Sequence, residues 1–353
     1  MAAKPTLVVC FRSEPVAQPL IDRIAAAWPE VDIINTDQSG IASALFQADY
    51  FCGHAKVPVD WDGIVSQGRL RWIQSSAAGM DWCLVPSVID SDITVTTAAG
   101  VLSDQVAEHG MALILAWHRN IRQFVLDQFS PQGNEFWHRF KRKPTWDLTG
   151  KTIGIVGLGG VGRRFSAVAA PFARRLLAVD LFPENKPAHV DELWGADRLD
   201  DLLAQCDVVF LSLPLNSQTR GIMTAEKFRR MKPGALLANM ARGGLVDTDA
   251  LVESIAEGHL GGAIMDVTSP EPLPADHPLW DFPNVLITPH VGGQIHCRFE
   301  DICDIFCENV RRYKAGEPLI NYLTHEGKQL GFPLRGAGYP LWIDVKQRYS
   351  SRS

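Results

Sequence analysis

The sequence lacks several patterns that mark other classes of protein. Its seven cysteines are odd in number, scattered and free of C-x-x-C spacing, which argues against a disulfide framework and a structural zinc site. No apolar run reaches the length that spans a membrane, and the N-terminal residues lack the apolar core of a signal peptide. We therefore expect no metal site, no membrane partner and a location in a reducing cytoplasm.

The charge and the missing motifs exclude further classes. With 34 basic and 40 acidic side chains the net charge is -6, so no basic surplus is present to hold nucleic acid. No G-x-x-x-x-G-K-S/T loop suggests a nucleoside triphosphatase, and no tyrosine is followed four residues later by the lysine of a short-chain dehydrogenase. What remains is an ordinary globular composition, with 46% hydrophobic and 21% charged residues.

The apolar pattern predicts an α/β fold. A chain of 353 residues exceeds what one hydrophobic core usually organises, so two domains are expected. Short apolar runs alternate with helix-length segments in both halves of the chain. The expected strands lie near 6–11, 31–35, 49–52, 71–74 and 93–96, and then near 152–156, 176–179, 208–211, 235–238, 263–265 and 285–287. Strands separated by helical crossovers imply two doubly wound parallel sheets.

The most informative motif directly follows the expected strand 152–156. It reads Gly157-Leu158-Gly159-Gly160-Val161-Gly162, the G-x-G-x-x-G pattern of a dinucleotide site. Gly157 permits the tight turn, Gly159 lets the backbone approach a pyrophosphate, and Gly162 lets the next helix pack closely. The strand 176–179 then ends in Asp180, whose carboxylate can bind both hydroxyls of the adenosine ribose and would repel a 2′-phosphate. NAD is therefore predicted in preference to NADP.

Three polar residues follow strands of the second expected sheet. Arg242 offers a fork of donors suited to a substrate carboxylate and the adjacent carbonyl. Glu271 is presented between two prolines, and His290 follows the strand 285–287. An imidazole is the natural proton donor near neutral pH, and a neighbouring carboxylate favours its charged form. Because ligands bind outside the carboxyl ends of parallel strands, we expect these three side chains to converge beside the dinucleotide.

The ordered series of motifs resembles the D-isomer-specific 2-hydroxyacid dehydrogenase family, from about residue 6 to residue 323. The matching segments are Ser76–Asp81, Val106–Glu108, Gly157–Gly162, Leu213–Leu215, Asn239–Gly243, Asp266–Val267 with Glu271–Pro272, and Thr288–Gly293. In that family an arginine orients the substrate, a histidine passes a proton to the carbonyl oxygen during reduction, and a glutamate keeps that histidine charged. The resemblance implies these roles for Arg242, His290 and Glu271.

The resemblance also implies a Rossmann dinucleotide-binding domain inserted into a flavodoxin-like substrate domain. We expect a substrate domain of residues 1–104 plus 302–330, a Rossmann domain of residues 105–301, and a C-terminal tail of residues 331–353 without a predicted role. Main-chain amides around Ala78 and Gly79 would hold the substrate carboxylate. The residues expected to bind the cofactor are Gly157, Gly159, Gly160, Val161, Gly162, Asp180, Leu213, Pro214, Met240, Ala241, Asp266, Gly292 and Gly293, with Asp266 on the nicotinamide carboxamide.

The segment of about 118–148 is expected to form a protruding arm. It contains Phe136, Trp137, Phe140 and Trp146, which would expose an apolar surface on a monomer, so a homodimer is predicted. The alternative is that these aromatic side chains fold back onto their own domain. By resemblance, Trp137 matches an arm tryptophan that in some members reaches the partner subunit's active site.

The sequence therefore predicts an NAD-dependent oxidoreductase that transfers a hydride between NAD(H) and a small 2-oxo acid or D-2-hydroxy acid. By resemblance, Glu271 differs from the glutamine of formate dehydrogenases, and Ala78 differs from the lysine of phosphite dehydrogenases. Both differences favour a 2-oxo acid, such as glyoxylate, hydroxypyruvate or a bulkier relative. Two departures from the family pattern, Thr268 and Thr97–Gly100, do not touch the expected chemistry. The alternative function is an NADH-binding corepressor with little turnover, since corepressors of this fold keep the same three residues.

Overall fold

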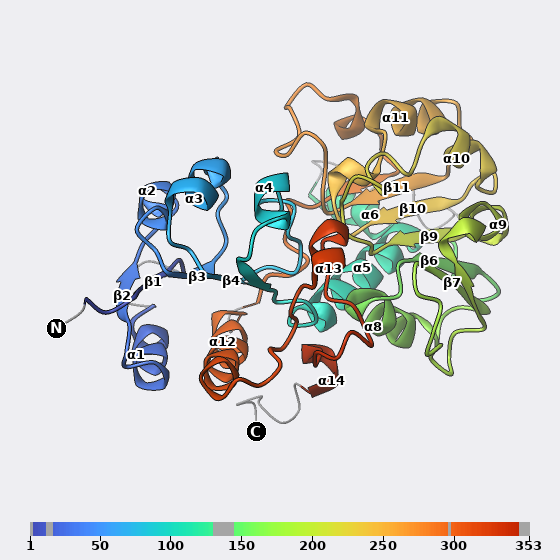
Figure 1. Ribbon diagram of the computed structural model, residues 1–353. Coiled ribbons are helices and arrows are strands. Elements are labelled where there is room, and N and C mark those ends of the chain that lie inside the picture. Colours follow the sequence, from blue (N-terminus) through green and yellow to red (C-terminus); the bar gives the residue numbers. More distant parts are fainter. Residues whose placement is uncertain (1–2, 12–16, 130–144, 296–297, 346–353) are drawn as a thin grey trace. The chain divides into compact units, whose positions relative to one another are not determined.

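The computed structural model describes residues 3–11, 17–129, 145–295 and 298–345 (Figure 1). The chain divides into two compact units. Unit 1 consists of residues 1–102 and 295–353, and unit 2 consists of residues 103–294. Among the described residues, no helix combines the length and apolar character needed to cross a bilayer.

Unit 1 is built on a five-stranded parallel sheet of order β2-β1-β3-β4-β5. Its elements are β1 (Thr6–Val9), α1 (Gln18–Ala27), β2 (Asp32–Asn35), α2 (Ile41–Leu45), β3 (Tyr50–Gly53), α3 (Trp61–Gln67), β4 (Trp72–Ser75), α4 (Pro86–Ile89), β5 (Thr94–Thr96), α12 (Arg298–Ala315), α13 (His325–Leu330) and α14 (Trp342–Val345). Leu7 and Val9 face one core and Val8 faces the other, as the two-residue period of a strand requires. Figure 1 shows α1 and α12 together on one of these faces.

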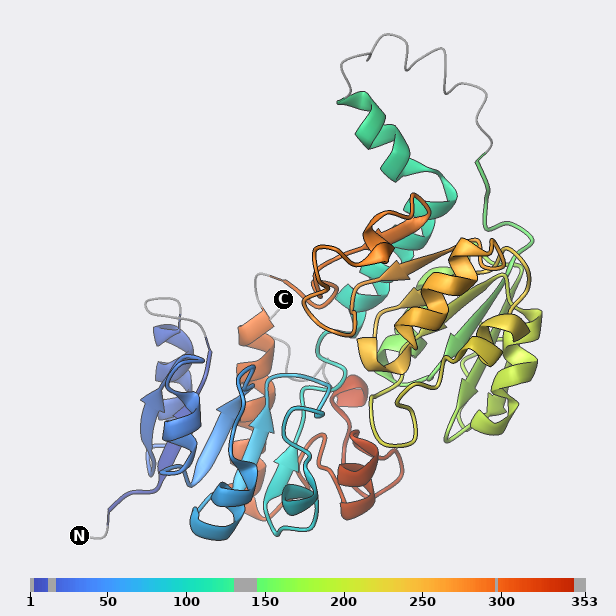
Figure 2. The same cartoon turned by 90° about the horizontal axis from the view of Figure 1, so that it is seen from above.

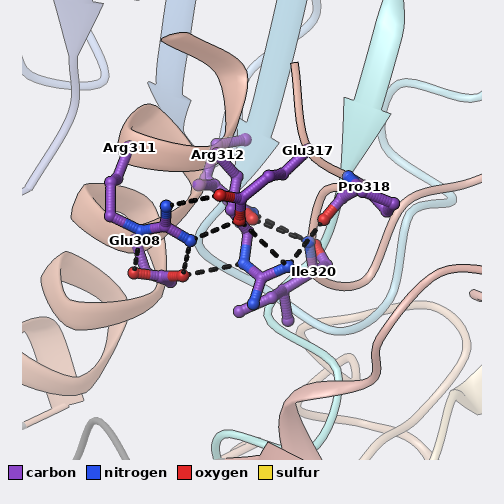
Figure 3. Close-up of polar contacts among 8 residues, drawn as sticks. Glu308, Arg311, Arg312, Glu317, Pro318 and Ile320 are labelled. Carbon is purple, nitrogen blue, oxygen red and sulfur yellow. Dashed lines mark hydrogen bonds and ion pairs between the residues drawn. The ribbon is translucent and has the colours of Figure 1, made fainter. Parts of the chain in front are cut away.

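The end of α12 is fixed by a cluster of charged side chains (Figure 3). Glu308 accepts hydrogen bonds from Arg311 at 2.9 and 3.0 Å and from Arg312 at 2.8 Å. Arg311 also binds Glu317, and Arg312 donates to the carbonyl of Pro318 at 2.9 Å. Burial of Glu308 opposes its ionisation, but the two arginines outweigh this effect and lower its pKa. The cluster thus ties the segment after α12 back onto the helix.

Residues 331–345, for which the sequence predicts no role, belong to unit 1. Trp342 is buried in its core, and its main-chain amide donates to the side chain of Asn321 at 2.9 Å. The amide group of Asn321 in turn donates to the carbonyls of Thr97 and Ala99. This asparagine therefore joins the end of β5 to the segment that contains α14.

Unit 2 is built on a seven-stranded parallel sheet of order β12-β11-β10-β9-β6-β7-β8. Its elements are α5 (Ser103–His118), α6 (Ile121–Gln128), β6 (Thr152–Val156), α8 (Gly160–Ala169), β7 (Arg175–Asp180), β8 (Glu192–Gly195), η1 (Ala196–Arg198), α9 (Leu199–Gln205), β9 (Val208–Leu211), α10 (Ala225–Arg230), β10 (Leu236–Asn239), η2 (Gly243–Leu245), α11 (Thr248–Ala256), β11 (Gly262–Met265), η3 (Pro278–Trp280) and β12 (Val285–Ile287). All five residues of β6 are buried, because helices cover both faces of the sheet.

All strands of this sheet are parallel, but the side on which successive strands are added changes at β6. The chain builds β7 and β8 on one side of β6 and then returns to add β9 to β12 on the other side. The carboxyl ends of β6 and β9 therefore mark the topological switch point, the position at which such sheets bind ligands. The predicted α/β class with two parallel sheets is confirmed. One strand was missed, because β8 was not predicted.

Candidate active site

The glycine turn after β6 has the geometry of a dinucleotide cradle. Gly157 has a φ of +92°, and a Cβ there would lie only 3.0 Å from the main chain of Leu213. A Cβ at Gly162 would overlap the carbonyl oxygen of Gly157, so this position also requires glycine. At Gly159 no heavy atom lies within 4 Å of the place where a Cβ would stand. The turn is therefore tightly constrained at Gly157 and Gly162 and open at Gly159.

The residues around this turn fit a pyrophosphate and a ribose. Gly159 is the N-cap of α8 and has no side chain that could cap the amides of the first turn. These amides, among them those of Gly160 and Val161, lie at the positive end of the helix dipole, where a phosphate can bind. Asp180 Oδ2 accepts a hydrogen bond from the amide of Leu158 at 2.6 Å, and Oδ1 accepts one from Phe182. Since each carboxylate oxygen has two lone pairs, both retain one for a ribose hydroxyl.

The turn after β10 presents Arg242. The buried side chain of Asn239 bridges this turn, because Oδ1 accepts from the amide of Ala241 at 3.1 Å and Nδ2 donates to the carbonyl of Arg242 at 2.8 Å. A Cβ at Gly243 would overlap the carbonyl group of Thr268, so the turn lies against the loop that follows β11. The expected cofactor residues Met240 and Ala241 belong to the same turn, and Leu213 and Pro214 follow β9.

The structure pairs His290 with Glu271. The Nδ1 atom of His290 lies 2.7 Å from Oε1 of Glu271, and each side chain is 44% exposed. Arg242, Glu271 and His290 follow β10, β11 and β12, which are neighbouring strands, so all three emerge from the carboxyl edge of one sheet. The pairing of Glu271 with His290 and this common edge are what the sequence predicts.

Asp266, the residue expected to contact the nicotinamide carboxamide, is also hydrogen-bonded to the turn that carries His290. Its carboxylate is only 3% exposed and accepts hydrogen bonds from the amides of Val291 and Gly292, both at 2.9 Å, and from the hydroxyl of Thr288 at 2.6 Å. The Nε2 atom of His109 lies 3.4 Å from its Oδ1. Gly292 is buried against this carboxylate, and Gly293 continues the same turn. Asp266 therefore holds the turn that carries His290.

The expected substrate anchors lie in unit 1. Ala78 and Gly79 follow β4 in an irregular segment, where Ala78 is exposed and Gly79 is half-buried. Within the described part of the chain, neither of their amides donates a hydrogen bond to another group. The segment is fixed by its neighbours, because Ser75 Oγ binds both the amide and the carbonyl of Ala77.

Sequence reasoning missed the supporting residues Asn239, His109 and Thr288. The first and last lie inside motifs that the sequence analysis identified, but their side chains act on main-chain turns, which a pattern of residue types does not reveal. His109 lies 179 residues from Thr288, so no local spacing connects the two. The arm residues Phe136, Trp137 and Phe140 lie outside the described residues, and Trp146 stacks on Trp117 with ring centroids 6.3 Å apart.

Comparison with known proteins agrees with this geometry. Residues 111–292 match the family model described as D-isomer specific 2-hydroxyacid dehydrogenase, NAD binding domain. A glyoxylate reductase of Thermofilum pendens is 36% identical over 260 residues, which are 73% of this chain and 76% of the relative. A glycerate dehydrogenase of Methylorubrum extorquens is 31% identical over 271 residues, which are 74% of this chain and 82% of the relative.

A solved structure shares the fold over almost the whole chain. It is a D-isomer specific 2-hydroxyacid dehydrogenase from Xanthobacter autotrophicus Py2 in complex with NADPH and MES, with a TM-score of 0.74 and 26% identity over 92% of this chain and 100% of that chain. The resemblance seen in the sequence is thereby confirmed, both in the matched domain and in the fold. The chain belongs to the family of NAD-dependent D-isomer-specific 2-hydroxyacid dehydrogenases.

Proposed function

We propose that the protein reduces a small 2-oxo acid with NADH to the corresponding D-2-hydroxy acid, and that His290 supplies the proton. The observation that carries this proposal is the 2.7 Å hydrogen bond between His290 Nδ1 and Glu271 Oε1, in the unit that also carries the dinucleotide turn. Since Nδ1 donates to the carboxylate, Nε2 is the ring nitrogen that holds the transferable proton. Glu271 thus fixes both the orientation of the ring and the atom that acts.

The other residues hold the substrate for this transfer. Bound NADH supplies the hydride that adds to the carbonyl carbon. The proton on His290 Nε2 passes to the carbonyl oxygen, which becomes a hydroxyl group, and the ring keeps its proton on Nδ1. The Arg242 guanidinium binds the substrate carboxylate and the oxygen on which negative charge develops. By the family resemblance, the amides of Ala78 and Gly79 in unit 1 are also proposed to bind a substrate carboxylate.

A short substrate is supported by the names of the relatives. One relative is a glyoxylate reductase and another is a glycerate dehydrogenase, and the chain covers about four fifths of each. Glyoxylate and hydroxypyruvate are therefore the first candidates, followed by 2-oxo acids with larger side chains. Asp180 at the end of β7 supports NADH over NADPH, because its carboxylate would repel a 2′-phosphate.

The proposal is tested by following NADH oxidation with a panel of 2-oxo acids and by determining the configuration of the product. We expect steady turnover with at least one short 2-oxo acid and a D-configured product. NADH binding without turnover on any acid of the panel would contradict the proposal and favour the corepressor alternative. His325→Ala, a change at an exposed histidine of unit 1, is the matched control for His290→Ala.

A homodimer formed through the arm is part of the proposal. Figure 2 shows α6 projecting away from the sheet of unit 2, and none of its residues is buried. Ile121, Val125 and Phe129 repeat every four residues and are 46%, 46% and 79% exposed, which gives one apolar helix face. Light scattering on the wild type should give twice the mass of the chain, and Val125→Glu should give the monomer. A monomeric wild type would contradict the dimer.

The cytoplasm is the proposed compartment. The six cysteines for which the structure describes a state are all free, and five of them, at positions 10, 52, 83, 206 and 303, are buried in the interior of their units. Free thiols are typical of reducing compartments. Fluorescence of a tagged chain expressed in its own host would test the location.

A further inference from the structure

The turn that carries His290 has an unusual main chain. His290 has a φ of +54°, a left-handed conformation that non-glycine residues adopt only when the surroundings impose it. Its amide donates to the carbonyl of Asp266 at 2.7 Å. The next two amides, of Val291 and Gly292, each donate to one carboxylate oxygen of Asp266 at 2.9 Å. Asp266 therefore holds three consecutive amides and imposes the turn.

The charge of Asp266 is maintained by its hydrogen-bond donors. Burial raises the pKa of this carboxyl group, but hydrogen bonds from His109, Thr288 and the amides of Val291 and Gly292 outweigh that effect and lower its pKa to about 2. The group is therefore an anion at neutral pH and can only accept hydrogen bonds. In each hydrogen bond to the Asp266 carboxylate, the hydrogen therefore belongs to the neighbouring group.

The positions of the hydrogens then follow for His109. The Thr288 hydroxyl donates to Asp266 Oδ1 at 2.6 Å, and a hydroxyl group has only one hydrogen. His109 Nε2 lies 3.0 Å from Thr288 Oγ1. Because the only hydrogen of this hydroxyl is already donated to Asp266, Thr288 Oγ1 must accept the hydrogen bond from His109. His109 Nε2 therefore carries a hydrogen, which points at Thr288 and Asp266. The tautomer of His109 is fixed by this chain of donors.

His109 is itself held by a rigid element. Helix α5 packs against α8, and Ala107, Met111 and Ile114 of α5 are buried in the core of unit 2. The helix also binds the start of β12, since Trp117 Nε1 donates to the carbonyl of Asn284 at 2.8 Å. Eight helical residues span about 12 Å and four strand residues span about 13 Å. Trp117 and His109 can therefore hold both ends of the segment 284–288.

We propose that His109 is a positioning residue, which donates its Nε2 hydrogen to Thr288 and Asp266 and thereby fixes the turn that presents His290 to Glu271. This gives Asp266 a role in the turn besides its expected contact with the nicotinamide carboxamide. It also explains the glycine at 292, because a Cβ there would stand 2.8 Å from Asp266 Oδ2 and 3.2 Å from the ring of His109. The catalytic consequence of the proposal rests on the proposed function.

Three substitutions at position 109 separate the hydrogen bond from the bulk of the ring. His109→Gln keeps an N–H group at the distance of Nε2, whereas His109→Asn keeps one only at the distance of Nδ1, and His109→Leu keeps none. Ala112→Gln, at an exposed position of α5, is the control for adding an amide to this helix. If Nε2 carries the hydrogen, glutamine at position 109 should preserve the function of the histidine in the turn, and asparagine should not.

Hydrogen–deuterium exchange of the full chain without cofactor gives a readout that does not depend on activity. In His109→Leu and His109→Asn, the peptide containing Val291 and Gly292 should exchange at least about tenfold faster than in the wild type. In His109→Gln and Ala112→Gln it should exchange within about threefold of the wild type. Wild-type exchange in His109→Leu, or equal exchange in the asparagine and glutamine variants, would overturn the proposal.

Kinetics give the second readout. With the best 2-oxo acid, kcat should fall at least about tenfold in His109→Leu, the equivalent of one lost hydrogen bond, and return to within about threefold of the wild type in His109→Gln. NADH affinity should stay within about threefold in all variants. If the wild type reduces no 2-oxo acid, the proposed function fails, and the exchange experiment still decides the role of His109.

A second pair of variants protects the test against a misfolded leucine variant. Thr288→Ser keeps the hydroxyl group between His109 and Asp266, and Thr288→Val removes it with little change of shape. We expect fast exchange at Val291 and Gly292 in the valine variant and wild-type exchange in the serine variant. Equal exchange in the two variants would contradict the proposed chain of donors.

Discussion

His290 Nδ1 lies 2.7 Å from Glu271 Oε1, although the two residues emerge from different loops at the edge of the seven-stranded sheet. Both side chains are about half-exposed, so the ring has a partner on one nitrogen and remains accessible on its other side. A donor built in this way can deliver a proton from Nε2 without turning the ring. The pair and the glycine turn lie at the carboxyl ends of strands in the same parallel sheet.

The charge of Glu271 is tested by Glu271→Gln. The amide oxygen can still accept from His290 Nδ1, but it no longer supplies a negative charge beside the ring. We expect kcat for reduction to fall about 100-fold, as for the loss of an effective general acid, with NADH affinity nearly unchanged. Asp276→Asn removes a charge from an exposed position of the same loop and should leave kcat unchanged. Equal losses in both variants would count against a specific role for Glu271.

The glycine turn predicts opposite outcomes for two neighbouring glycines. A Cβ at Gly162 would overlap the carbonyl oxygen of Gly157, so Gly162→Ala should destabilise the fold by about 1–3 kcal/mol. A Cβ at Gly159 meets no atom of the protein, and the φ of -74° suits alanine, so Gly159→Ala should change the unfolding free energy by less than about 0.5 kcal/mol.

NADH titration completes that comparison. Gly159→Ala places its methyl group where the pyrophosphate is proposed to approach, so NADH affinity should fall at least about tenfold. Wild-type NADH affinity in this stable variant would show that the dinucleotide does not approach the turn at Gly159.

Asp180 is predicted to set the preference for NADH over NADPH. In Asp180→Ala the repulsion of a 2′-phosphate disappears, so the ratio of kcat/KM for NADH to that for NADPH should fall at least about tenfold. Asp191→Asn is the matched control, because Asp191 also accepts a main-chain hydrogen bond, from Leu176 at 2.7 Å, at the other end of β7. An unchanged ratio in the alanine variant would place the selectivity elsewhere.

The pKa of Asp266 predicts a pH-dependent contribution to stability. With a pKa of about 2 in the folded chain against an ordinary value of 3.8, ionised Asp266 stabilises the folded state above pH 4 and loses this effect as the pH falls toward 2. The unfolding free energy of Asp266→Asn should be lower than that of the wild type by about 2 kcal/mol at pH 7, and the difference should shrink between about pH 4 and pH 2. A difference that stays constant over this range would exclude an ionised Asp266.

Local patterns predicted much of the fold. The run Thr152–Val156 is short, apolar and β-branched, and the glycines after it leave few main-chain alternatives, so strand and turn follow from neighbouring residues alone. The strand Val208–Leu211 was predicted for the same reason. In contrast, β8 reads Glu-Leu-Trp-Gly, and its half-buried residues at the sheet edge form no apolar run, so only its pairing with β7 makes it a strand.

The sequence predicted those candidate site residues that carry a reactive or charged side chain after a strand. Arg242, Glu271 and His290 each follow a strand, and the sheet brings them to one edge whatever the connecting helices contain. The residues that hold their turns were not predictable. Asn239 acts on main-chain atoms, and His109 meets Thr288 across 179 residues of sequence, so both contacts depend on the packing of the whole unit.

The most direct test of the account compares NADH oxidation by the wild type and by His290→Ala with the best 2-oxo acid, together with NADH affinity measured by fluorescence. We predict that kcat in the variant falls at least about 100-fold, while NADH affinity stays within about threefold of the wild type. If the alanine variant turns over at a rate within about threefold of the wild type, His290 is not the proton donor and the central claim is wrong.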